Sequence, residues 1–348
     1  MTRVYVGMSG GVDSSVTASL LVDQGYDVTG IYMKNWTQDL PGMRCPWADD
    51  LADAKRVAVQ LGIPLKVYDF QTQYKQRVVD YMISEYQASR TPNPDIMCNQ
   101  EVKFKLFLDT ALADGADMIA TGHYAKIGKS NEQTNPVLLR PRDETKDQTY
   151  FLYRISSEAL GKTLFPLGML TKTEVRAIAE AKGLATARKK DSQGICFVGS
   201  VGIKEFLSQY VTTEPGEIID KATGHAIGYH DGAIYYTLGQ RHGLGMGGGL
   251  PYYVVGKDMA ANRVIVSRDL SDESMWRDTV ELTGIHWIND APREGEVLLA
   301  RLRHRGQLLP CRLQGDSLQL EEAERAATAG QSAVLYRGDE VLGGGIIV

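Results

Sequence analysis

The sequence predicts an α/β protein: a doubly wound parallel-sheet domain, then a small mixed or all-β central domain, and a C-terminal β-barrel. Strand-like apolar runs alternate with helical patterns over residues 1–125, which is typical of a doubly wound parallel sheet. A glycine-rich turn directly follows the first of these runs. From residue 215 onward, short β-like runs between Gly and Asp turns replace helical periodicity, which favours a small barrel.

The N-terminal elements follow from residue patterns taken in order. Strands are expected at 4–8, 27–33, 64–70 and 117–121, and helices at 14–24, 49–61, 78–86 and 99–113. The 49–61 stretch, for example, has apolar residues at the i, i+3, i+4 spacing of an amphipathic helix. Farther along, Thr171 and Glu174 form a capping-box signature for a helix that ends at Gly183.

The second half of the chain predicts β structure. Short strands are expected at 217–219, 233–236, 252–255 and 264–266, and barrel strands at 297–303, 308–313, 317–320, 332–336 and 344–348. With a length of 348 residues, two or three domains are the natural expectation. We predict domains at 1–200, 201–268 and 269–348, with the 171–183 helix a candidate to pack on the central domain.

Composition and charge bound the class of protein. The chain is 43% apolar and 23% charged, as ordinary globular proteins are. No apolar run approaches the ~18–20 residues that span a membrane, and the first strand leaves no room for a signal peptide. We therefore expect a cytoplasmic protein without a membrane partner. The net charge of −5 argues against nucleic acid as a partner unless cations cluster locally.

The glycine-rich turn is the most informative motif. Residues 9–14 read Ser-Gly-Gly-Val-Asp-Ser, and the two glycines permit backbone angles and close approach that a Cβ would forbid. The free N–H groups of the following helix start favour phosphate. A Walker-type loop would place Lys and Ser/Thr after its last glycine, whereas this loop has Val12-Asp13-Ser14. The pattern resembles the PP-loop of ATP pyrophosphatases, which activate a carbonyl oxygen with AMP.

A second motif, 91–99, contains two prolines and a cysteine. The prolines fix a rigid loop, and Asn99 can cap the helix that follows. Cys98 would then lie immediately before a helix start, where the dipole lowers the pKa of a thiol. Asp95 is placed to exchange a proton with it. The alternative is a helix-capping turn with an incidental cysteine.

The other three cysteines are far apart in sequence. The chain has four cysteines in all, a pattern that does not indicate a disulfide scaffold. Cys196 follows a run of three cations, Arg188-Lys189-Lys190, which is an electropositive setting for a thiolate, although such a run is often a solvated face. Cys45, in a loop that could expose it, is expected to be incidental or structural. Cys311 is expected in the core or wall of the barrel.

An ATP-activating loop with two cysteines in polar, charged segments indicates sulfur transfer to an activated carbon. These motifs are similar to those of the tRNA-specific 2-thiouridylase family, bacterial-type enzymes that thiolate the wobble uridine. The resemblance covers nearly the whole chain. Matching stretches are 7–15, 32–36, 50–54, 91–99, 120–124, 146–148, 190–197, 236–241, 330–333 and 342–346.

The resemblance implies an ATP site and a magnesium ligand. Asp13 would help to hold Mg²⁺, which needs oxygen ligands, and Met33 and Gly122 would line the adenosine pocket. The full set implied to bind ATP is Gly7, Met8, Ser9, Gly10, Gly11, Val12, Asp13, Ser14, Met33 and Gly122.

The resemblance also implies the chemistry. Uracil O2 at position 34 of the tRNA is adenylated, and a Cys196 persulfide then supplies sulfur to C2 with Cys98 as partner thiol. A transient Cys98–Cys196 disulfide would remain, with Asp95 as acid or base; the products are 2-thiouridine, AMP and pyrophosphate. The alternative is an iron–sulfur cluster held by these three residues. We favour the persulfide, because such clusters commonly use tight Cys-x-x-Cys spacing and the sequence has none.

Local cations could bind tRNA phosphates despite the net negative charge. Candidates from the sequence are the 188–190 run, Lys103 and Lys105, and Arg301, Arg303 and Arg305, which would share one face of a strand. The resemblance implies that tRNA is contacted by Asn93, Pro94, Asp95, His123, Lys146, Asp147, Gln148, Arg303, His304 and Gln331. It further implies tRNAs for Lys, Glu and Gln, and a cysteine desulfurase or a sulfur-relay carrier as donor.

Two other functions remain open from the residues alone. One is a different PP-loop synthetase that adenylates a small molecule, and the other is a non-catalytic nucleotide sensor. Neither assigns a task to Cys98 and Cys196.

Overall fold

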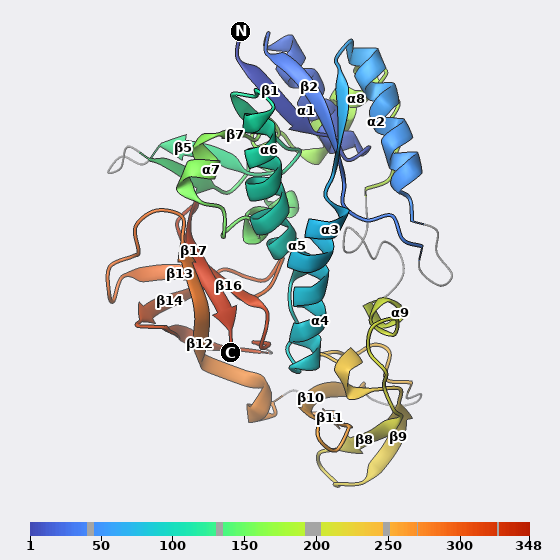
Figure 1. Ribbon diagram of the computed structural model, residues 1–348. Helices are drawn as coiled ribbons and strands as arrows, with labels where there is room; N and C mark the ends of the chain where they lie inside the picture. The colour runs from blue at the N-terminus through green and yellow to red at the C-terminus, as the bar shows by residue number, and fades with distance from the viewer. Residues whose placement is uncertain (40–44, 130–134, 192–202, 246–250, 270, 326) are drawn as a thin grey trace.

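The structure is a computed structural model that describes residues 1–39, 45–129, 135–191, 203–245, 251–269, 271–325 and 327–348. Three sheets follow one another along the chain, and two strands from the N-terminal region, β5 and β6, join the third sheet (Figure 1). Within the described residues, no helix is long and apolar enough to cross a membrane.

The first sheet has five parallel strands in the order β3-β2-β1-β4-β7. Their bounds are β1 Arg3–Gly7, β2 Asp27–Lys34, β3 Leu65–Asp69, β4 Met118–Ala120 and β7 Thr163–Leu164. Val4 and Val6 of β1 pack on one face and Tyr5 on the other, because successive side chains alternate across a strand. Both faces are therefore buried, which confirms the predicted doubly wound parallel sheet.

Helices cover both faces of this sheet. They are α1 Val12–Asp23, α2 Trp47–Leu61, α6 Phe107–Ala113 and α8 Lys172–Ala181. Val12 and Val16 of α1 pack against Val175 and Ala179 of α8. The helix expected at 171–183 thus lies against the N-terminal domain rather than the central one.

Two further helical runs contain a wider, π-helical segment. Short helices α3 Gln71–Tyr74 and α4 Asp80–Gln87 flank the segment Lys75–Val79, and α5 Pro94–Met97 leads through Cys98–Leu106 into α6. The π-helical turn is rare and often marks functional positions. Cys98, the first residue of the second such segment, is one of the predicted reactive thiols.

The central domain contains a four-stranded sheet in the order β10-β11-β8-β9. Bounds are α9 Ile203–Leu207, β8 Gly216–Asp220, β9 Ala226–His230, β10 Tyr253–Asp258 and β11 Arg263–Ser267. The strand predicted at 233–236 is wrong, since Ala233–Tyr235 forms a short 3-10 helix. Ala233 and Tyr236 pack into the core of this sheet. The residues at 233–236 are therefore apolar because they are buried, and not because they pair with a strand.

The C-terminal sheet closes into a six-stranded antiparallel barrel, as predicted. The order is β12-β15-β14-β13-β16-β17, and β12 pairs back with β17. Bounds are β12 Trp276–Trp287, β13 Val297–Arg301, β14 Leu309–Gln314, β15 Ser317–Arg325, β16 Ser332–Arg337 and β17 Glu340–Ile347. Cys311 is fully buried in the barrel core, which confirms its predicted place.

The predicted ladder of Arg301, Arg303 and Arg305 on one strand face is wrong. Strand β13 ends at Arg301, which is buried, and Arg305 has a φ of +59°. A positive φ is incompatible with an extended strand, so the three guanidinium groups do not share a face.

A hairpin from the N-terminal region extends the barrel sheet. Strands β5 Lys126–Lys129 and β6 Pro136–Leu139 pair with each other, and β6 pairs with β17. The buried carboxylate of Asp147 also accepts a hydrogen bond from Arg301 Nη1 at 2.9 Å. Part of the chain inside the predicted 1–200 domain is therefore continuous with the barrel.

Candidate active site

The glycine-rich loop lies between β1 and α1, beside β4, where the order of strands reverses. Ligands of doubly wound sheets bind at this kind of switch point. Gly11 is the N-cap of α1, and Gly10 has a φ of +75°. A Cβ on Gly10 would lie 2.3 Å from the backbone oxygen of Asp50. Only glycine therefore fits this turn without displacing α2.

Two predicted adenosine-pocket residues lie against the same loop. A Cβ on Gly122 would lie 2.9 Å from Ser14 N, and Met33 Cε lies 3.1 Å from where a Cβ on Gly7 would be. The structure thus gathers the predicted ATP-binding residues around one turn, although their contact with ATP stays a prediction.

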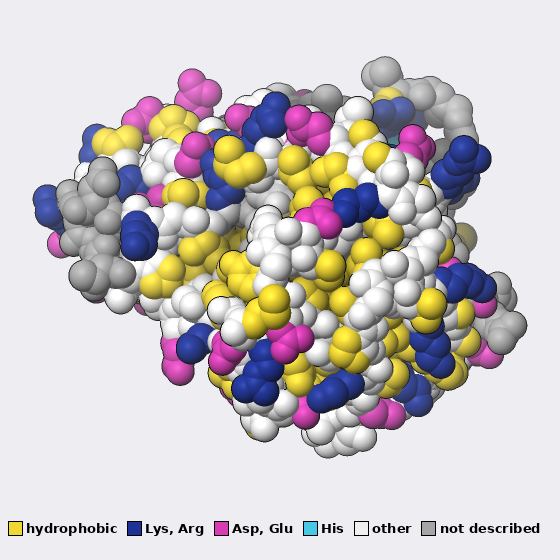
Figure 2. All heavy atoms as spheres, turned by 90° about the horizontal axis from the view of Figure 1, so that it is seen from above, with side chains coloured by type: hydrophobic (Ala, Val, Ile, Leu, Met, Phe, Trp, Pro, Cys, Tyr) yellow, Lys and Arg dark blue, Asp and Glu magenta, His cyan; other side chains and the backbone are white. Residues whose placement is uncertain are grey.

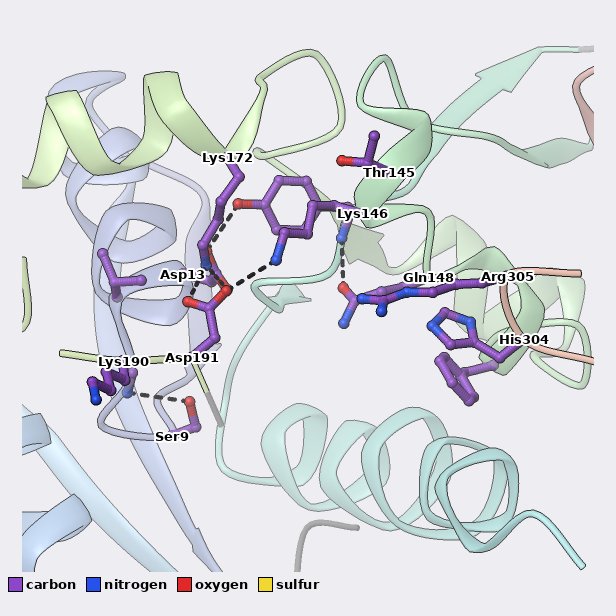
Figure 3. Close-up of a pocket in the computed structure, with 14 residues that line it drawn as sticks. Ser9, Asp13, Thr145, Lys146, Gln148, Lys172, Lys190, Asp191, His304 and Arg305 are labelled. Carbon is purple, nitrogen blue, oxygen red and sulfur yellow. Dashed lines mark hydrogen bonds and ion pairs between the residues drawn. The ribbon is translucent and has the colours of Figure 1, made fainter. Parts of the chain in front are cut away.

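A charged cavity of about 280 Å³ opens beside this loop (Figure 3). In Figure 3, Ser9 and Asp13 lie on one side, while His304 and Arg305 from the turn after β13 lie on the other. Its lining residues are Ser9, Gly11, Val12, Asp13, Tyr124, Thr145, Lys146, Gln148, Phe151, Lys172, Lys190, Asp191, His304 and Arg305. The cavity is therefore shared by the N-terminal domain and the barrel.

Ion pairs organise the charged cavity. Lys172 Nζ lies 2.7 and 2.8 Å from the two carboxylate oxygens of Asp13, and Tyr124 donates to Asp13 at 2.9 Å. Lys172 also lies 2.8 Å from Asp191, which pairs with Lys146 at 3.0 Å. Burial alone would raise the pKa of Asp191, but hydrogen bonds and charge contacts with Lys172 and Lys146 lower it to about 2. This carboxyl is ionised at neutral pH.

A second cavity, of about 180 Å³, adjoins the other side of Ser9. It is mostly apolar and holds two thiols. Its lining residues are Met8, Ser9, Tyr32, Met33, Asn35, Trp36, Cys45, Pro46, Trp47, Asp50, Tyr74, Cys98 and Lys103. We call these two spaces the charged cavity and the thiol cavity.

The local structure around Cys98 differs from the prediction. The helix begins at Pro94 and not at Asn99, because Asn93 is the cap and its side chain accepts from the backbone N–H groups of Asp95 and Ile96. Proline is tolerated at the first helical position, where its missing N–H has no partner to lose. Cys98 therefore lies inside a continuous helix.

Burial sets the state of the Cys98 thiol. The side chain is 1% exposed, and its pKa is raised by burial, with the charge of Asp95 adding to the rise. Lys103 and a hydrogen bond with Tyr74 oppose this rise without overcoming it. The predicted lowering of the pKa by a helix start is thus wrong.

Cys45 is also buried, at 8% exposure, although its loop could have exposed it; burial is compatible with the expected incidental or structural thiol. Its Sγ lies 3.6 Å from the backbone oxygen of Trp36, and burial raises its pKa. Cys196 lies outside the described residues, so the approach of Cys98 and Cys196 stays a prediction. In the described part of the chain, no three His, Cys, Asp or Glu side chains gather as metal ligands, and the iron–sulfur alternative, which needs Cys196, stays untested.

The residues predicted to contact tRNA fall into distinct places. Lys146, Gln148 and His304 line the charged cavity. Asn93 caps its helix, and the neighbouring Thr91 accepts a hydrogen bond from Gln331 at 2.7 Å.

Two others are buried. Asp147 is 4% exposed, and Arg301 and Arg140 hold its carboxylate at 2.9 and 3.3 Å. His123 is buried, which lowers the pKa of its imidazole well below the usual value.

The predicted basic surface is largely paired. Arg303 is exposed and lies 3.1 Å from Glu324. Lys189 pairs with Asp50 and Asp53 at 2.7 and 2.6 Å, so residues 188–190 do not form one open cationic run. On the face in Figure 2, which looks down on the N-terminal domain, Lys and Arg side chains alternate with Asp and Glu.

Sequence reasoning missed Tyr124, Lys172 and Asp191 as cavity residues, and it named Arg305 only as a phosphate contact on a strand face. One signal was available: a phosphate loop without its own lysine predicts a cation supplied from elsewhere. The capping box at Thr171 predicted where α8 begins, but it did not predict that the Lys172 side chain contacts Asp13.

Comparison with known proteins places the chain in a family. Family models match residues 2–200 (tRNA methyl transferase HUP domain), 204–268 (tRNA methyl transferase PRC-barrel domain) and 277–347 (Aminomethyltransferase beta-barrel domain). A solved 4-thiouridine synthetase–RNA complex with bound ATP aligns with 60% of this chain and 50% of that chain, at a TM-score of 0.38 and 20% identity.

Curated relatives match almost end to end. The tRNA-specific 2-thiouridylase MnmA of Streptococcus sanguinis strain SK36 is 48% identical over 355 residues, covering 99% of this chain and 95% of that protein. The protein of the same name from Enterococcus faecalis strain V583 is 47% identical over 357 residues, with the same coverage of both chains. This chain therefore belongs to the tRNA-specific 2-thiouridylase family.

Proposed function

We propose that the protein is an ATP-dependent tRNA sulfurtransferase that converts the uridine at wobble position 34 of tRNA to 2-thiouridine. Family membership supports this activity. The observation that carries the proposal is the position of Ser9, which lines both the charged cavity and the thiol cavity. One turn thus adjoins a space suited to phosphates and a space that contains Cys98. Because its substrate is tRNA, we also propose a cytoplasmic location.

The reaction begins with adenylation. Uracil O2 attacks the α-phosphorus of ATP, the bond to the β-phosphate breaks, and pyrophosphate leaves. Gly11 and Val12 at the start of α1 line the charged cavity, and backbone N–H groups at a helix start stabilise phosphate charge. We assign ATP binding to Gly7–Ser14, with Met33 and Gly122 at the adenosine.

Magnesium fits at one residue. The Asp13 carboxylate offers the hard oxygen ligands that Mg²⁺ prefers, and it adjoins the loop, but Lys172 and Tyr124 occupy it now. Bound Mg²⁺ would neutralise charge on the leaving pyrophosphate. Lys172 contacts both carboxylate oxygens of Asp13, so it would compete with the ion for this ligand.

Sulfur transfer follows in two steps. The terminal sulfur of a Cys196 persulfide attacks C2, and AMP leaves with O2. The Cys98 thiolate then attacks the inner sulfur of Cys196, the S–S bond to the transferred sulfur breaks, and a Cys98–Cys196 disulfide forms. An external thiol must reduce this disulfide before the next turnover. Asp95 receives the Cys98 proton, which the raised pKa of that buried thiol makes necessary.

Binding of tRNA is assigned to the edge of the charged cavity. Lys146, Gln148, His304 and Arg305 line it from two domains. We assign a second tRNA contact to Asn93 and Gln331, because Gln331 donates a hydrogen bond to the backbone oxygen of Thr91, two residues before Asn93. The wobble base must leave its stack to reach Cys98. We further propose tRNAs for Lys, Glu and Gln as substrates and a cysteine desulfurase or relay carrier as sulfur donor.

The test is mass spectrometry of tRNA nucleosides after reaction with ATP, Mg²⁺ and a sulfur donor. We expect 2-thiouridine, together with pyrophosphate release that depends on tRNA. The matched control is the same tRNA with cytidine at position 34, which should give neither. A small-molecule synthetase would release pyrophosphate without tRNA, and a nucleotide sensor would release none; either result contradicts the proposal.

A second measurement separates the two sulfur routes. An anaerobic preparation without iron should be fully active if the persulfide supplies the sulfur. Activity that requires bound iron would instead support a cluster.

A further inference from the structure

Lys172 reaches the glycine-rich loop from a different helix. The loop has no lysine of its own, since Val12 follows its last glycine. Lys172 is the first residue of α8, and its ammonium contacts both carboxylate oxygens of Asp13. Its side chain is only 12% exposed. A cation thus lies at the start of α1 although it is 159 residues away in sequence.

The backbone of Lys172 is held firmly. Thr171 caps α8, and its capping box with Glu174 is complete. The backbone N–H of Lys172 donates to Asp143 at 2.9 Å. These contacts fix where the side chain starts, so its ammonium can exchange partners within the charged cavity without movement of the helix.

The pairing of Lys172 is suited to a charged ligand. Its ammonium contacts Asp13 and Asp191, and Asp191 is also held by Lys146 and Arg176, the latter at 2.6 Å. Asp191 therefore keeps two cationic partners if Lys172 leaves. Asp13 would lose its only cation among the contacts described here, and would then be ready to bind another one.

We propose that Lys172 binds the polyphosphate of ATP: its ammonium leaves Asp13 for the β- or γ-phosphate oxygens, and the freed Asp13 carboxylate takes Mg²⁺. The inference rests on the proposed ATP-dependent function. Lys172 then performs the task of the lysine that the loop lacks. After the α–β bond breaks, the same ammonium stabilises the negative charge that develops on pyrophosphate.

The competing explanation is that Lys172 only clips α8 to α1. The chain itself offers a control, because Lys182 at the other end of α8 pairs with Asp23 at the other end of α1. Both pairs join the same two helices, and ten residues separate them on each helix. A structural clip should matter equally at both ends, whereas a phosphate ligand should matter only at Lys172.

The experiment compares Lys172→Met, Lys172→Arg and Lys182→Met by isothermal titration calorimetry without tRNA. The ligands are ATP with Mg²⁺, pyrophosphate with Mg²⁺, and AMP. Loss of a charge-assisted contact should weaken binding of ATP and pyrophosphate by about 10- to 100-fold in Lys172→Met. AMP, which lacks the β- and γ-phosphates, should bind as in the wild type. Lys172→Arg should recover part of the loss, and Lys182→Met should bind all three normally.

The outcomes separate the two proposals. If wild-type protein binds no ATP, the proposed function fails. If wild type binds ATP and Lys172→Met binds it equally well, or loses AMP affinity to the same degree, the role of Lys172 is overturned.

A second variant covers the case in which Lys172→Met does not fold. Asp13→Asn removes the competing carboxylate and leaves the lysine in place. Metal-free pyrophosphate should then bind at least as tightly as to wild type, and Mg²⁺ should add less affinity. Weaker binding of metal-free pyrophosphate by Asp13→Asn would contradict the exchange of partners.

Discussion

The two cavities that meet at Ser9 have opposite electrostatic designs. In the charged cavity, cationic partners lower the pKa of Asp191 to about 2, which favours the ionised carboxylate. In the thiol cavity, burial raises the pKa of both Cys45 and Cys98, which favours the neutral thiols. The difference shows that the charged cavity already holds cations that can bind phosphate, whereas the thiol cavity does not stabilise a thiolate. The nucleophile must be activated during the reaction, by a proton acceptor or by the arrival of substrate.

The largest expected effect is in the thiol cavity. Cys98→Ser should abolish 2-thiouridine formation, since a serine hydroxyl cannot resolve the persulfide, while ATP affinity stays within about twofold of wild type. Nucleoside mass spectrometry and calorimetry measure the two quantities. Cys45→Ser changes a thiol that lines the same cavity and should retain thiolation. Full activity of Cys98→Ser would remove the thiol cavity from the mechanism.

The next largest effect is at the loop between the cavities. Gly10→Ala would place a Cβ 2.3 Å from the backbone of Asp50 at a φ of +75°. We expect a loss of about 2 kcal/mol or more in the free energy of unfolding, and ATP affinity at least about tenfold weaker. Gly25→Ala has a φ of +80° and no atom within 4 Å, so strain alone should cost it about 1 kcal/mol. Denaturant titration compares them; equal losses would show that the clash with Asp50 is irrelevant.

A third prediction uses the pH dependence of the thiol cavity. Since the pKa of Cys98 is raised, the thiolate fraction grows only at high pH, and the single-turnover rate of thiolation should rise with pH above neutrality. The charge of Lys103 lowers this pKa, so Lys103→Met should move the rising limb to still higher pH. Rates measured at saturating tRNA separate this effect from binding. A limb that stays in place would mean that Cys98 is not the group that titrates.

The smallest expected effect concerns charge outside both cavities. Arg303 is exposed and paired with Glu324, and it does not line the charged cavity. Arg303→Glu should weaken tRNA binding and flatten the dependence of log K on log salt by about one unit of slope. Arg337→Glu, another exposed arginine of the barrel sheet, is the matched control and should leave the slope unchanged. An unaltered slope for Arg303→Glu would leave the cavity residues alone responsible for phosphate contact.

Much of the fold follows from local patterns. The alternation of buried strands and amphipathic helices predicted the parallel sheet, and the short C-terminal runs predicted the barrel. The strand at 233–236 failed because buried 3-10 turns and strands share the same apolar composition. The arginine ladder failed because the sequence does not show where β13 ends, and Arg305 turns away with a positive φ.

The site was predictable in its motifs and not in its environment. The loop at 9–14 was recognisable because glycine and helix-start chemistry are local. The state of Cys98 was not, since its raised pKa depends on burial among residues brought together by the fold. Lys172 was missed for a related reason: its contact with Asp13 spans 159 residues, and no local pattern reports such a distance.

The hairpin β5–β6 has a consequence for how this protein can be divided. Because β6 pairs with β17, a fragment ending at residue 200 would leave the hairpin without its neighbour and expose backbone donors and acceptors along an unprotected strand. A barrel expressed from residue 269 would lack Asp147, the buried counter-ion of Arg301. The N-terminal fragment would expose an unpaired edge strand, which promotes aggregation, and the barrel fragment would bury an unpaired charge. We therefore expect fragments that end or begin at the predicted domain boundaries to be less stable than the same regions in the full-length protein.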